Sequence, residues 1–537
     1  METYDYIVIG AGSSGSVMAG RLSEDRDSRV LLLDAGPDSD NFWVSTPAGM
    51  GKLFRNDRFN WGFETAPVPS LGGRSIYWPR GKTTGGSSSI NGMVYMRGHP
   101  RDFDLWRERG NAGWGWDDVL PYFIRSESNE RGADAIHGGD GPFRVTDPVV
   151  RHPTTTDFIE AASRIGLRRL EDLNAPPYEG VGYQQFNIRD GRRESSYTAY
   201  VKPHRHRANL TVLTGALATR IVVENGVATG VEIEHGGARR TVNAAREVIL
   251  SAGSLKSPHL LMLSGIGDGG ILAKAGVAQN VHLPGVGRNL QDHWFAPFLL
   301  RATPESSYNR SLHGWRKYLE GFRYLVTRRG YLALGSSAVS AYVKSSDDEP
   351  QPDLQLVMRP MTFHFHPSGE AMVDPFPGLS GAVVLVGPKS AGHVELTSPD
   401  PHASPAFHPN YLGDPDDIRR TLAGMHLMRR ILATAPFSGR VVAEQAPGPQ
   451  ATSDEDLIAY LKASGSCAWH QTGTCRMGAD DMAVVDARLK VHGVERLRVV
   501  DASIMPQITS GNTGAPAVMI GEKAADMVRS DAAPRRL

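Results

Sequence analysis

The sequence begins with a strand, turn and helix pattern whose turn is rich in glycine. Residues 6–9 form a short apolar run, the turn Gly10-Ala-Gly-Ser-Ser-Gly15 follows it, and residues 14–23 have helical character. A second apolar run, residues 29–33, ends at Asp34. A glycine turn between a strand and a helix, with an acidic residue after the next strand, is typical of a βαβ unit that binds a dinucleotide.

Each glycine of the turn has a separate role in this interpretation. Gly10 permits the tight turn, Gly12 lets the backbone approach a pyrophosphate, and Gly15 allows the helix to pack closely. The helix N-terminus attracts the negative charge of the ligand. Asp34 would bind a ribose hydroxyl. The pattern by itself does not distinguish FAD from NAD.

Two later stretches repeat this logic. Residues 247–253 indicate a buried strand that runs into a glycine turn, and residues 497–501 indicate another such strand. Strands separated by hundreds of residues indicate one domain built from discontinuous segments. We therefore expect an α/β fold with a discontinuous Rossmann-like domain, made of residues 1–155, 205–305 and 465–537.

The remaining residues, 156–204 and 306–464, contain many prolines and no glycine fingerprint, and they indicate a second domain. Segments 382–386 and 392–396 have the pattern of antiparallel strands. We expect an α+β substrate domain whose antiparallel sheet forms a wall of the substrate cavity.

Composition excludes several classes of function. The net charge is formally zero and the pI is about 7.3, so nucleic-acid binding is not expected. Cys467 and Cys475 are the only cysteines, which excludes a disulfide framework and favours a reducing compartment. The N-terminus lacks a secretion signal, and no apolar stretch is long enough to span a membrane. We expect a cytoplasmic protein, with peripheral membrane contact left open.

A second glycine- and serine-rich loop runs from Arg80 to Met93 and offers many backbone N–H groups to a polar ligand. This loop resembles the flavin-contacting loop of the glucose-methanol-choline (GMC) oxidoreductases. Residues 251–267 resemble the second signature of that family, and residues 283–293 and 499–503 are similar to further family blocks. The resemblance covers essentially the whole chain and implies FAD as the cofactor.

The resemblance and the first fingerprint together give a set of expected FAD-binding residues. They are Gly10, Gly12, Ser13, Ser14, Gly15, Asp34, Ala35, Trp61, Arg80, Gly81, Gly85, Gly86, Ser87, Asn91, Gly92, Met93, Val94, Ala218, Ala252, Gly253, Trp469, Asp501, Ala502 and Thr513. Thr84 replaces the aliphatic residue usual in the family, with little expected consequence. Ile90 stands where choline oxidases carry a histidine bound covalently to the flavin, so we predict non-covalent FAD.

The expected catalytic pair comes from the C-terminal region. His470, in Trp469-His-Gln-Thr-Gly473, and Asn512, in Gly511-Asn-Thr, resemble the active-site pair of the family. An alcohol must lose its hydroxyl proton as its carbon gives hydride to flavin N5, and imidazole can accept that proton near neutral pH. Asn512 would hydrogen-bond the same oxygen, so this chain has the His/Asn form of the pair.

Other prominent residues favour structural roles. Cys467 and Cys475 are expected to pack as small apolar side chains. His293, His364 and His366 lack an accompanying set of ligands, so no metal site is expected. Trp469 fits either the core or the wall of the cavity.

The substrate is less constrained than the reaction. By an approximate match, Ala338 occupies the place of the glutamate that holds trimethylammonium in choline enzymes, which disfavours choline. The Trp469-His470 pair is similar to hydroxymethylfurfural oxidases and favours an aromatic or furanic primary alcohol. Other blocks are equally similar to aliphatic alcohol and choline dehydrogenases, so oxygen and quinone both remain as acceptors. Hydroxynitrile lyases share the fold, and the first fingerprint alone also permits a nicotinamide dehydrogenase.

Overall fold

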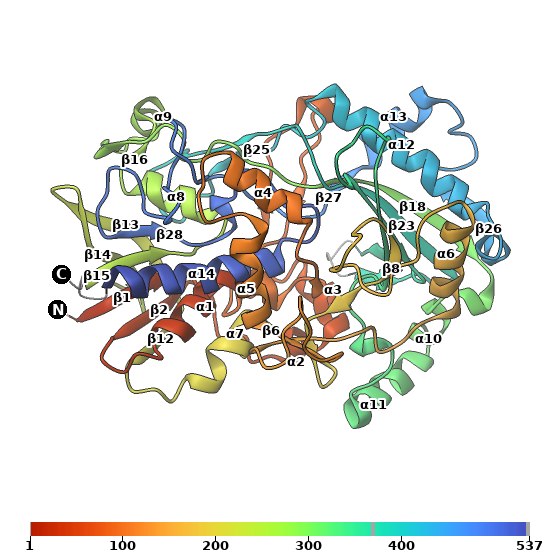
Figure 1. Ribbon diagram of the computed structural model, residues 1–537, viewed down its shortest axis with the longest axis horizontal. Helices are drawn as coiled ribbons and strands as arrows, with labels where there is room; N and C mark the ends of the chain where they lie inside the picture. The colour runs from red at the N-terminus through yellow and green to blue at the C-terminus, as the bar shows by residue number, and fades with distance from the viewer. Residues whose placement is uncertain (1, 367–370, 533–537) are drawn as a thin grey trace.

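The computed structural model describes residues 2–366 and 371–532. Two large mixed or antiparallel sheets, one in each half of the molecule, lie at opposite ends of its long axis (Figure 1). The first sheet fills the half that contains both chain termini, and the second sheet fills the other half. This arrangement confirms the expected combination of a Rossmann-like domain and a domain with an antiparallel sheet.

The first sheet is assembled from distant parts of the chain. Its strands follow the order β12 (Leu210–Thr214), β2 (Val30–Asp34), β1 (Thr3–Ile9), β15 (Ala238–Leu250), β14 (Val227–His235) and β13 (Ala216–Glu224), and β28 (Leu497–Val499) also pairs with β15. The pairs from β12 through β15, and β15 with β28, are parallel. All five residues of β2 are buried, as expected for a parallel strand covered on both faces.

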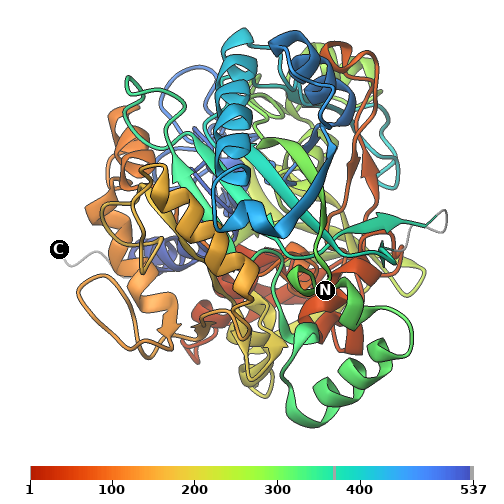
Figure 2. The same ribbon diagram turned by 90° about the vertical axis from the view of Figure 1, so that its right-hand side faces the viewer.

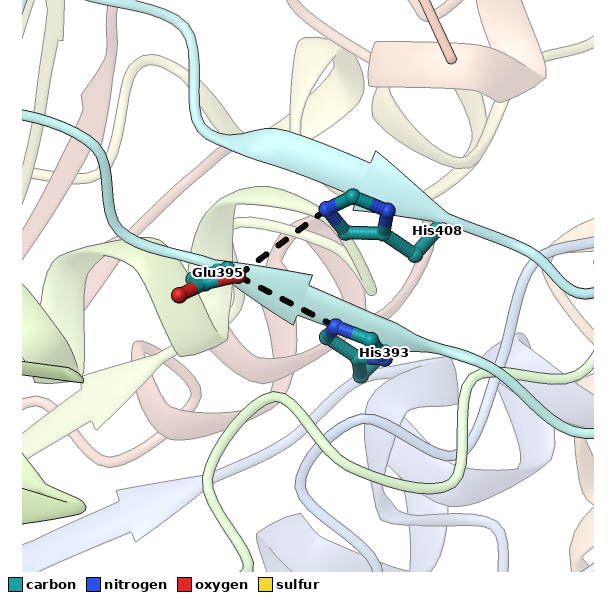
Figure 3. Close-up of side chains that lie close together, drawn as sticks. All are labelled: His393, Glu395 and His408. Atoms are coloured by element: carbon teal, nitrogen blue, oxygen red, sulfur yellow. Dashed lines mark ion pairs between the residues drawn. The ribbon is translucent and has the colours of Figure 1, made fainter. Parts of the chain in front are cut away.

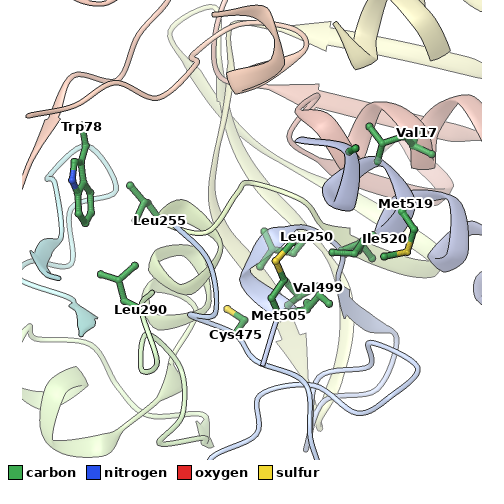
Figure 4. Close-up of a cluster of buried hydrophobic side chains, with 14 of the residues drawn as sticks. Val17, Trp78, Leu250, Leu255, Leu290, Cys475, Val499, Met505, Met519 and Ile520 are labelled. Atoms are coloured by element: carbon green, nitrogen blue, oxygen red, sulfur yellow. The ribbon is translucent and has the colours of Figure 1, made fainter. Parts of the chain in front are cut away.

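Helices α1 (Ser13–Leu22) and α14 (Gly514–Ala532) pack together against this sheet. Figure 4 shows Val17 of α1 beside Met519 and Ile520 of α14, with Leu250 and Val499 of the sheet nearby. The C-terminal helix therefore closes the domain that the N-terminal strand begins.

The second sheet is antiparallel and covers the opposite side of the cavity described below. Its order is β26 (Val441–Ala446), β18 (Trp294–Ala302), β23 (Gly378–Leu385), β20 (Leu354–Arg359), β19 (Val339–Val343) and β8 (Gly180–Tyr183), and β27 (Ser466–Cys467) pairs with β18. Helix α12 (Pro415–Leu432) packs on one face, in front of the sheet in Figure 2. Burial alternates along β18, so its side chains divide between the two faces.

The domain boundaries expected from sequence differ from the sheet pairing at two strands. Strands β18 and β27 lie in segments assigned to the Rossmann-like domain, but both pair within the second sheet. The chain passes from one domain to the other near residue 293, immediately before β18.

Shorter elements complete the two halves of the molecule. The helices are α2 (Phe42–Ser45), α3 (Met50–Leu53), α4 (Pro100–Glu108), α5 (Trp116–Ser126), α6 (Pro153–Arg164), α7 (Ser196–Tyr200), α8 (Lys256–Leu263), α9 (Gly269–Lys274), α10 (Asn309–Leu312), α11 (Arg316–Thr327) and α13 (Asp454–Ser464). The paired short strands are β3 (Phe63–Glu64) with β4 (Tyr77–Trp78), β5 (Val94–Tyr95) with β9 (Gln185–Phe186), β6 (Glu127–Asn129) with β7 (Phe143–Val145), β10 (Ile188–Arg189) with β11 (Arg192–Arg193), β16 (Ile266–Gly267) with β17 (Val281–His282), β21 (Phe363–Phe365) with β22 (Ala371–Val373), and β24 (His393–Glu395) with β25 (Ala406–His408). In the described ranges, no helix has both the length and the apolar composition that crossing a bilayer requires.

A buried carboxylate joins helix α14 to three other helices. The fully buried Glu522 side chain of α14 accepts hydrogen bonds from Arg21 of α1 at 2.8 Å, Arg125 of α5 at 2.9 Å and the hydroxyl of Tyr200 of α7 at 2.7 Å. A charge removed from water is stabilising only when its partners are all present. Glu522 thus connects the two ends of the chain.

We expect Glu522→Gln to lower the thermal unfolding midpoint strongly. Breaking a buried ion pair costs about 3 kcal/mol or more, which corresponds to a decrease of roughly 3 °C or more in a protein of this size. Glu24→Gln is the matched control, because Glu24 binds the same Arg21 at a partly exposed position and should cost about 1 kcal/mol or less. Equal midpoints for the two variants would contradict this role of Glu522.

Candidate functional site

A cavity of about 540 Å³ lies between the glycine turns of the first domain and one face of the second sheet. His470, Asn512 and all but two of the expected FAD-binding residues line it. The two exceptions are Gly15 and Gly85, which support the lining residues from behind. The sequence-based site is therefore brought together in one place.

The first glycine turn has the geometry expected of each glycine. Gly10 has φ of +99°, which favours glycine. A Cβ on Gly15 would lie 1.9 Å from the carbonyl oxygen of Gly10, whereas a Cβ on Gly12 would meet only the carbonyl oxygen of Ser251, at 3.9 Å. Space remains above Gly12, so a ligand can approach its backbone closely.

Gly85 supports the second loop. Its φ is +86°, and its N–H donates to the carbonyl oxygen of Ala11 at 2.6 Å. A Cβ on the next residue, Gly86, would lie 2.8 Å from Cα of Gly12. The two glycine-rich loops thus touch each other beside the cavity.

Two buried carboxylates at strand ends hold the loops in place. Asp34 accepts hydrogen bonds from the N–H groups of Ala11 at 3.0 Å and Gly36 at 2.8 Å, and burial raises its pKa to about 6. Asp501 accepts from the N–H of Gly253 at 2.9 Å and from the hydroxyl of Ser257 at 2.6 Å. Both residues line the cavity. The contact of Asp34 with a ribose hydroxyl stays a prediction.

His470 is held on three sides. Its Nε2 accepts a hydrogen bond from the Asn512 side-chain amide at 3.1 Å, and its Nδ1 lies 3.0 Å from Nδ1 of His293. Its backbone N–H donates to Asp292 at 2.7 Å, and Asp292 also accepts from the hydroxyl of Tyr411 at 2.5 Å. Because Asn512 donates to Nε2, the ring hydrogen of His470 lies on Nδ1 and is donated to His293.

Burial, the neighbouring His293 and the Arg80 guanidinium lower the pKa of His470 well below its usual range. Burial also lowers the pKa of His293 to about 3. Protonation of either ring would place a cation in a buried position, where the adjacent Asp292 carboxylate already accepts hydrogen bonds from the His470 N–H, Tyr411 and Gln471. His470 is thus neutral at pH 7, with an unprotonated Nε2 at the cavity.

Backbone strain marks both sides of the cavity. Trp469 and Met93 have φ of +60°, a region that non-glycine residues rarely occupy. The Trp469 carbonyl accepts from Arg80 at 2.6 Å, and its indole N–H donates to the carbonyl of Tyr77 at 3.2 Å. Trp469 lines the cavity, so it forms part of the wall.

The second sheet supplies the other wall of the cavity. Cross-strand pairing arranges alternate side chains of β18, β23 and β20 in three rows: Phe295, Val384 and Gln355; Pro297, Ala382 and Val357; Leu299, Ser380 and Arg359. Phe295 of the first row lies two residues after His293 in the chain. The third row lies four residues further along the strands, about 13 Å away.

Arg359 places a positive charge in this wall. Its Nε donates to the carbonyl of Ser336 at 2.5 Å and an Nη donates to the hydroxyl of Ser337 at 3.1 Å, and burial lowers its pKa to about 10. No carboxylate of the described residues forms an ion pair with it. The only carboxylates lining the described cavity, Asp34 and Asp501, lie at the edge of the first sheet.

Several functional residues were missed in the sequence analysis. Asp292 and His293 lie in the family block 283–293, but His293 was considered only as a metal ligand. Lys256 lines the cavity, and burial together with Lys82 lowers its pKa to about 8. Ala338, which was compared above with the choline-binding glutamate, is buried but does not line the cavity.

The histidines considered as metal ligands are not brought together. His293 contacts His470, and His364 pairs with Asp374 at 2.6 Å on the surface. A different group, His393, Glu395 and His408, gathers on β24 and β25 outside the cavity (Figure 3). Cys467 and Cys475 are buried free thiols, as expected.

The residues present fit a flavin dinucleotide. The glycine turn leaves room for a pyrophosphate, and two buried polar atoms at the cavity, Oγ of Ser251 and Oδ1 of Asn512, have no hydrogen-bond partner among the described residues. Buried polar groups are normally satisfied, so such atoms are available to a ligand.

Comparison with known proteins agrees with this geometry. Family models described as GMC oxidoreductase match residues 4–295 and 388–521. The chain is 41% identical to an oxygen-dependent choline dehydrogenase of Rhizobium etli (strain CIAT 652), with 98% of this chain and 95% of the relative covered. It is 38% identical to an alcohol dehydrogenase [acceptor] of Pseudomonas putida, with 98% and 95% covered.

Among solved structures, the pyridoxine 4-oxidase of Mesorbium loti superposes with a TM-score of 0.88 at 34% identity, covering 97% of this chain and 98% of the other. The matches span both domains and include every block on which the resemblance was based. The chain belongs to the GMC oxidoreductase family and is an FAD-dependent oxidoreductase that acts on alcohols.

Proposed function

We propose that this enzyme oxidises an aromatic or furanic primary alcohol to the aldehyde, with His470 as the base and Asn512 as the residue that holds the alcohol oxygen. The observation that carries the proposal is the unprotonated Nε2 of His470, which faces the cavity beside the Asn512 amide. A neutral imidazole and an amide donor at one point suit an alcohol hydroxyl.

His470, Asn512 and Ile90 have different roles in the proposed reaction. FAD, when bound in this cavity, would supply the hydride acceptor for the alcohol carbon. The alcohol oxygen would replace Nε2 of His470 as the acceptor of the Asn512 amide, which frees the Nε2 lone pair to take the hydroxyl proton. The Nδ1–H of His470 is then still donated to His293, so the ring keeps its orientation while it becomes positively charged. Ile90 lines the cavity and offers no nucleophile to the flavin, which supports non-covalent binding of FAD.

An aromatic alcohol is favoured by the lining of the substrate side. Trp469, Phe295 and Phe363 line the cavity, and flat aromatic faces suit a flat substrate. The pyridoxine 4-oxidase that superposes on the chain is named for an alcohol with an aromatic ring.

Choline dehydrogenation is the second candidate, because choline dehydrogenases are among the most similar relatives. The ammonium group of choline would share this cavity with the Arg359 guanidinium, which lies about 13 Å along the wall from the row beside His470, and no carboxylate of the described residues lines the same wall to balance either charge. Like charges in such a cavity repel by about 1 kcal/mol over this distance, so we expect choline to be a poor substrate. Oxygen and a quinone both remain acceptors in this proposal.

Anaerobic mixing with a panel of alcohols tests the reaction. Benzyl alcohol or 5-hydroxymethylfurfural should bleach the flavin absorbance as the flavin is reduced. An unchanged spectrum with every alcohol would overturn the proposal, and release of aldehyde and cyanide from a cyanohydrin without bleaching would instead identify a lyase.

We expect His470→Ala to retain FAD but to slow flavin reduction by roughly 100-fold or more, the scale of general base catalysis. His282→Ala, at an exposed position on β17, is the matched control and should reduce at the wild-type rate. Rapid-reaction absorbance measures both, and unchanged kinetics in His470→Ala would refute the role of this residue.

Substitution of Arg359 tests the origin of substrate preference. In Arg359→Leu, kcat/KM for choline relative to benzyl alcohol should rise by about tenfold, since removal of one repulsion of about 1.4 kcal/mol changes a ratio by that factor. Arg359→Lys keeps the charge and should keep the wild-type ratio. If the Leu and Lys variants discriminate equally, the charge of Arg359 does not decide the preference.

A further inference from the structure

Helix α11 turns its apolar face towards solvent. Trp315, immediately before the helix, and Tyr318, Leu319, Phe322, Leu325 and Val326 are each more than half exposed; these six residues are called the α11 face below. They recur every three to four residues, which places them on one side of a helix. A surface helix normally turns such a stripe towards the core.

The opposite side of α11 is the one that contacts the protein. Tyr324 is fully buried, its hydroxyl donates to the carbonyl of Gly191 at 3.0 Å, and its ring lies 6.4 Å from that of Phe42. Both views show α11 at the periphery of the molecule (Figures 1 and 2). The exposed apolar face is therefore a fixed surface of the fold.

Positive charge surrounds the α11 face. Segment 310–329 has one acidic residue, Glu320, which is paired with Arg323 at 3.6 Å. Its basic residues are Arg310, Arg316, Lys317, Arg323, Arg328 and Arg329. The net charge of the whole chain is formally zero, so this segment has a strong local excess of positive charge.

Aromatic and basic groups are interleaved at this surface. The Lys317 ammonium lies 5.1 Å from the ring centroid of Tyr318, and the Arg316 guanidinium lies 5.9 Å from that of Trp315. On neighbouring α2, Phe42 and Trp43 are also exposed, and the Lys52 ammonium lies 5.7 Å from the ring of Trp43. Partial burial and the nearby Lys317 lower the pKa of Lys52, consistent with an electropositive surface.

We propose that the α11 face docks the enzyme onto a membrane whose surface carries anionic lipids. Helices that lie in the plane of a bilayer have this composition, with aromatic and aliphatic residues on one face and Lys and Arg beside it. The apolar side chains would enter the headgroup boundary, Trp315 and Tyr318 would lie at the level favoured by amphipathic rings, and the basic residues would meet the lipid phosphates.

A second copy of the chain fits this surface less well. A symmetric dimer through the α11 face would place the same basic residues of the two copies against each other. An anionic lipid surface neutralises them instead. Charge complementarity therefore selects the membrane.

The docking surface is continuous with part of the lining of the cavity. The segment that carries Phe42 and Trp43 continues into Met50 and Phe54, which line the cavity. Helix α3 contacts β22, where Met372 is exposed. Docking would therefore bring the cavity close to molecules dissolved in the lipid. The proposal depends on this surface alone and not on which alcohol is oxidised.

Flotation of the holoenzyme with lipid vesicles tests the proposal. Wild-type enzyme should float with vesicles of phosphatidylcholine and phosphatidylglycerol, and less with phosphatidylcholine alone or at high salt. The variant Trp315→Ser/Leu319→Ser/Phe322→Ser should bind roughly tenfold or more weakly, and Arg316→Gln/Lys317→Gln/Arg323→Gln should lose the preference for anionic vesicles.

Val442→Ser is the matched control, because Val442 is an exposed apolar residue on the distant strand β26 and its loss should leave flotation unchanged. All variants should keep the flavin spectrum and turnover with a soluble dye acceptor, which separates lost docking from lost folding. The proposal would be overturned if the Trp315 triple variant floats as well as the wild type, or if the wild type does not float. It would also be overturned if the wild type sediments as a dimer that the triple substitution abolishes, while neither protein binds vesicles.

An independent observation concerns His393, Glu395 and His408 (Figure 3). His393 and His408 are directly opposite each other on β24 and β25, with rings stacked 4.6 Å apart, and Glu395 is two residues from His393 on the same face. A Glu395 carboxylate oxygen lies 4.0 Å from His393 and 3.9 Å from His408.

We infer that these three side chains bind one divalent transition-metal ion such as Zn²⁺, contrary to the expectation of no metal site. Two imidazoles and a carboxylate are a common donor set for this ion, and their donor atoms lie within 4.8 Å of one another. The site would brace a loop of the active site, because Gly392 and Val394 hydrogen-bond to the backbone of Leu290 and Gly287, just before Asp292.

Equilibrium dialysis of the tag-free, chelator-treated holoenzyme against ZnCl₂ tests this site. We expect one Zn²⁺ per chain, and weaker binding by about tenfold or more in His408→Ala, since even outer-shell substitutions reach that scale. His402→Ala, a nearby exposed histidine that pairs with Glu234, should bind as the wild type does. Wild-type affinity in His408→Ala, or no bound Zn²⁺, would overturn the inference.

Discussion

The parallel pairing of β1 with β15 is the constraint on which the site depends. It joins Ile9 to Leu250 across most of the first half of the chain, and β28 then extends the same sheet from near the C-terminus. Parallel strands place their carboxyl ends at one edge. Gly10, Gly253 and Asp501 therefore meet beside one cavity, although nothing in their sequence positions brings them together.

The sequence was most informative where local chemistry is unambiguous. A tight turn between a strand and a helix requires glycine whatever the rest of the fold, so the roles of Gly10 and Gly12 could be predicted from the local sequence. Arg359 could not, because its direction depends on the register of β20 against β23, and a shift of one residue would turn it away from the cavity. The same reason explains the boundary near residue 293. Whether β18 belongs to one sheet or the other is decided by cross-strand packing, which leaves no local signal.

The charges around His470 have two linked effects. Arg80 and His293 make it unfavourable for the resting imidazole to carry a proton. Positive groups in the same cavity, Arg80 and Lys256, stabilise negative charge that arrives there. In the reaction proposed above, such surroundings would keep the base neutral at rest and would tolerate imidazolium better once the cavity holds added negative charge. Under that proposal, the surroundings of the imidazole govern proton removal as much as the imidazole itself does.

Helix α11 is attached to the body of the protein mainly through Tyr324, and its outward residues contribute nothing to the core. Substitutions on that face carry little penalty for folding and leave the lining of the cavity untouched. The place where the enzyme works and the reaction that it catalyses are consequently open to separate selection. A few substitutions on the α11 face could therefore change membrane binding during evolution while the active site stays the same.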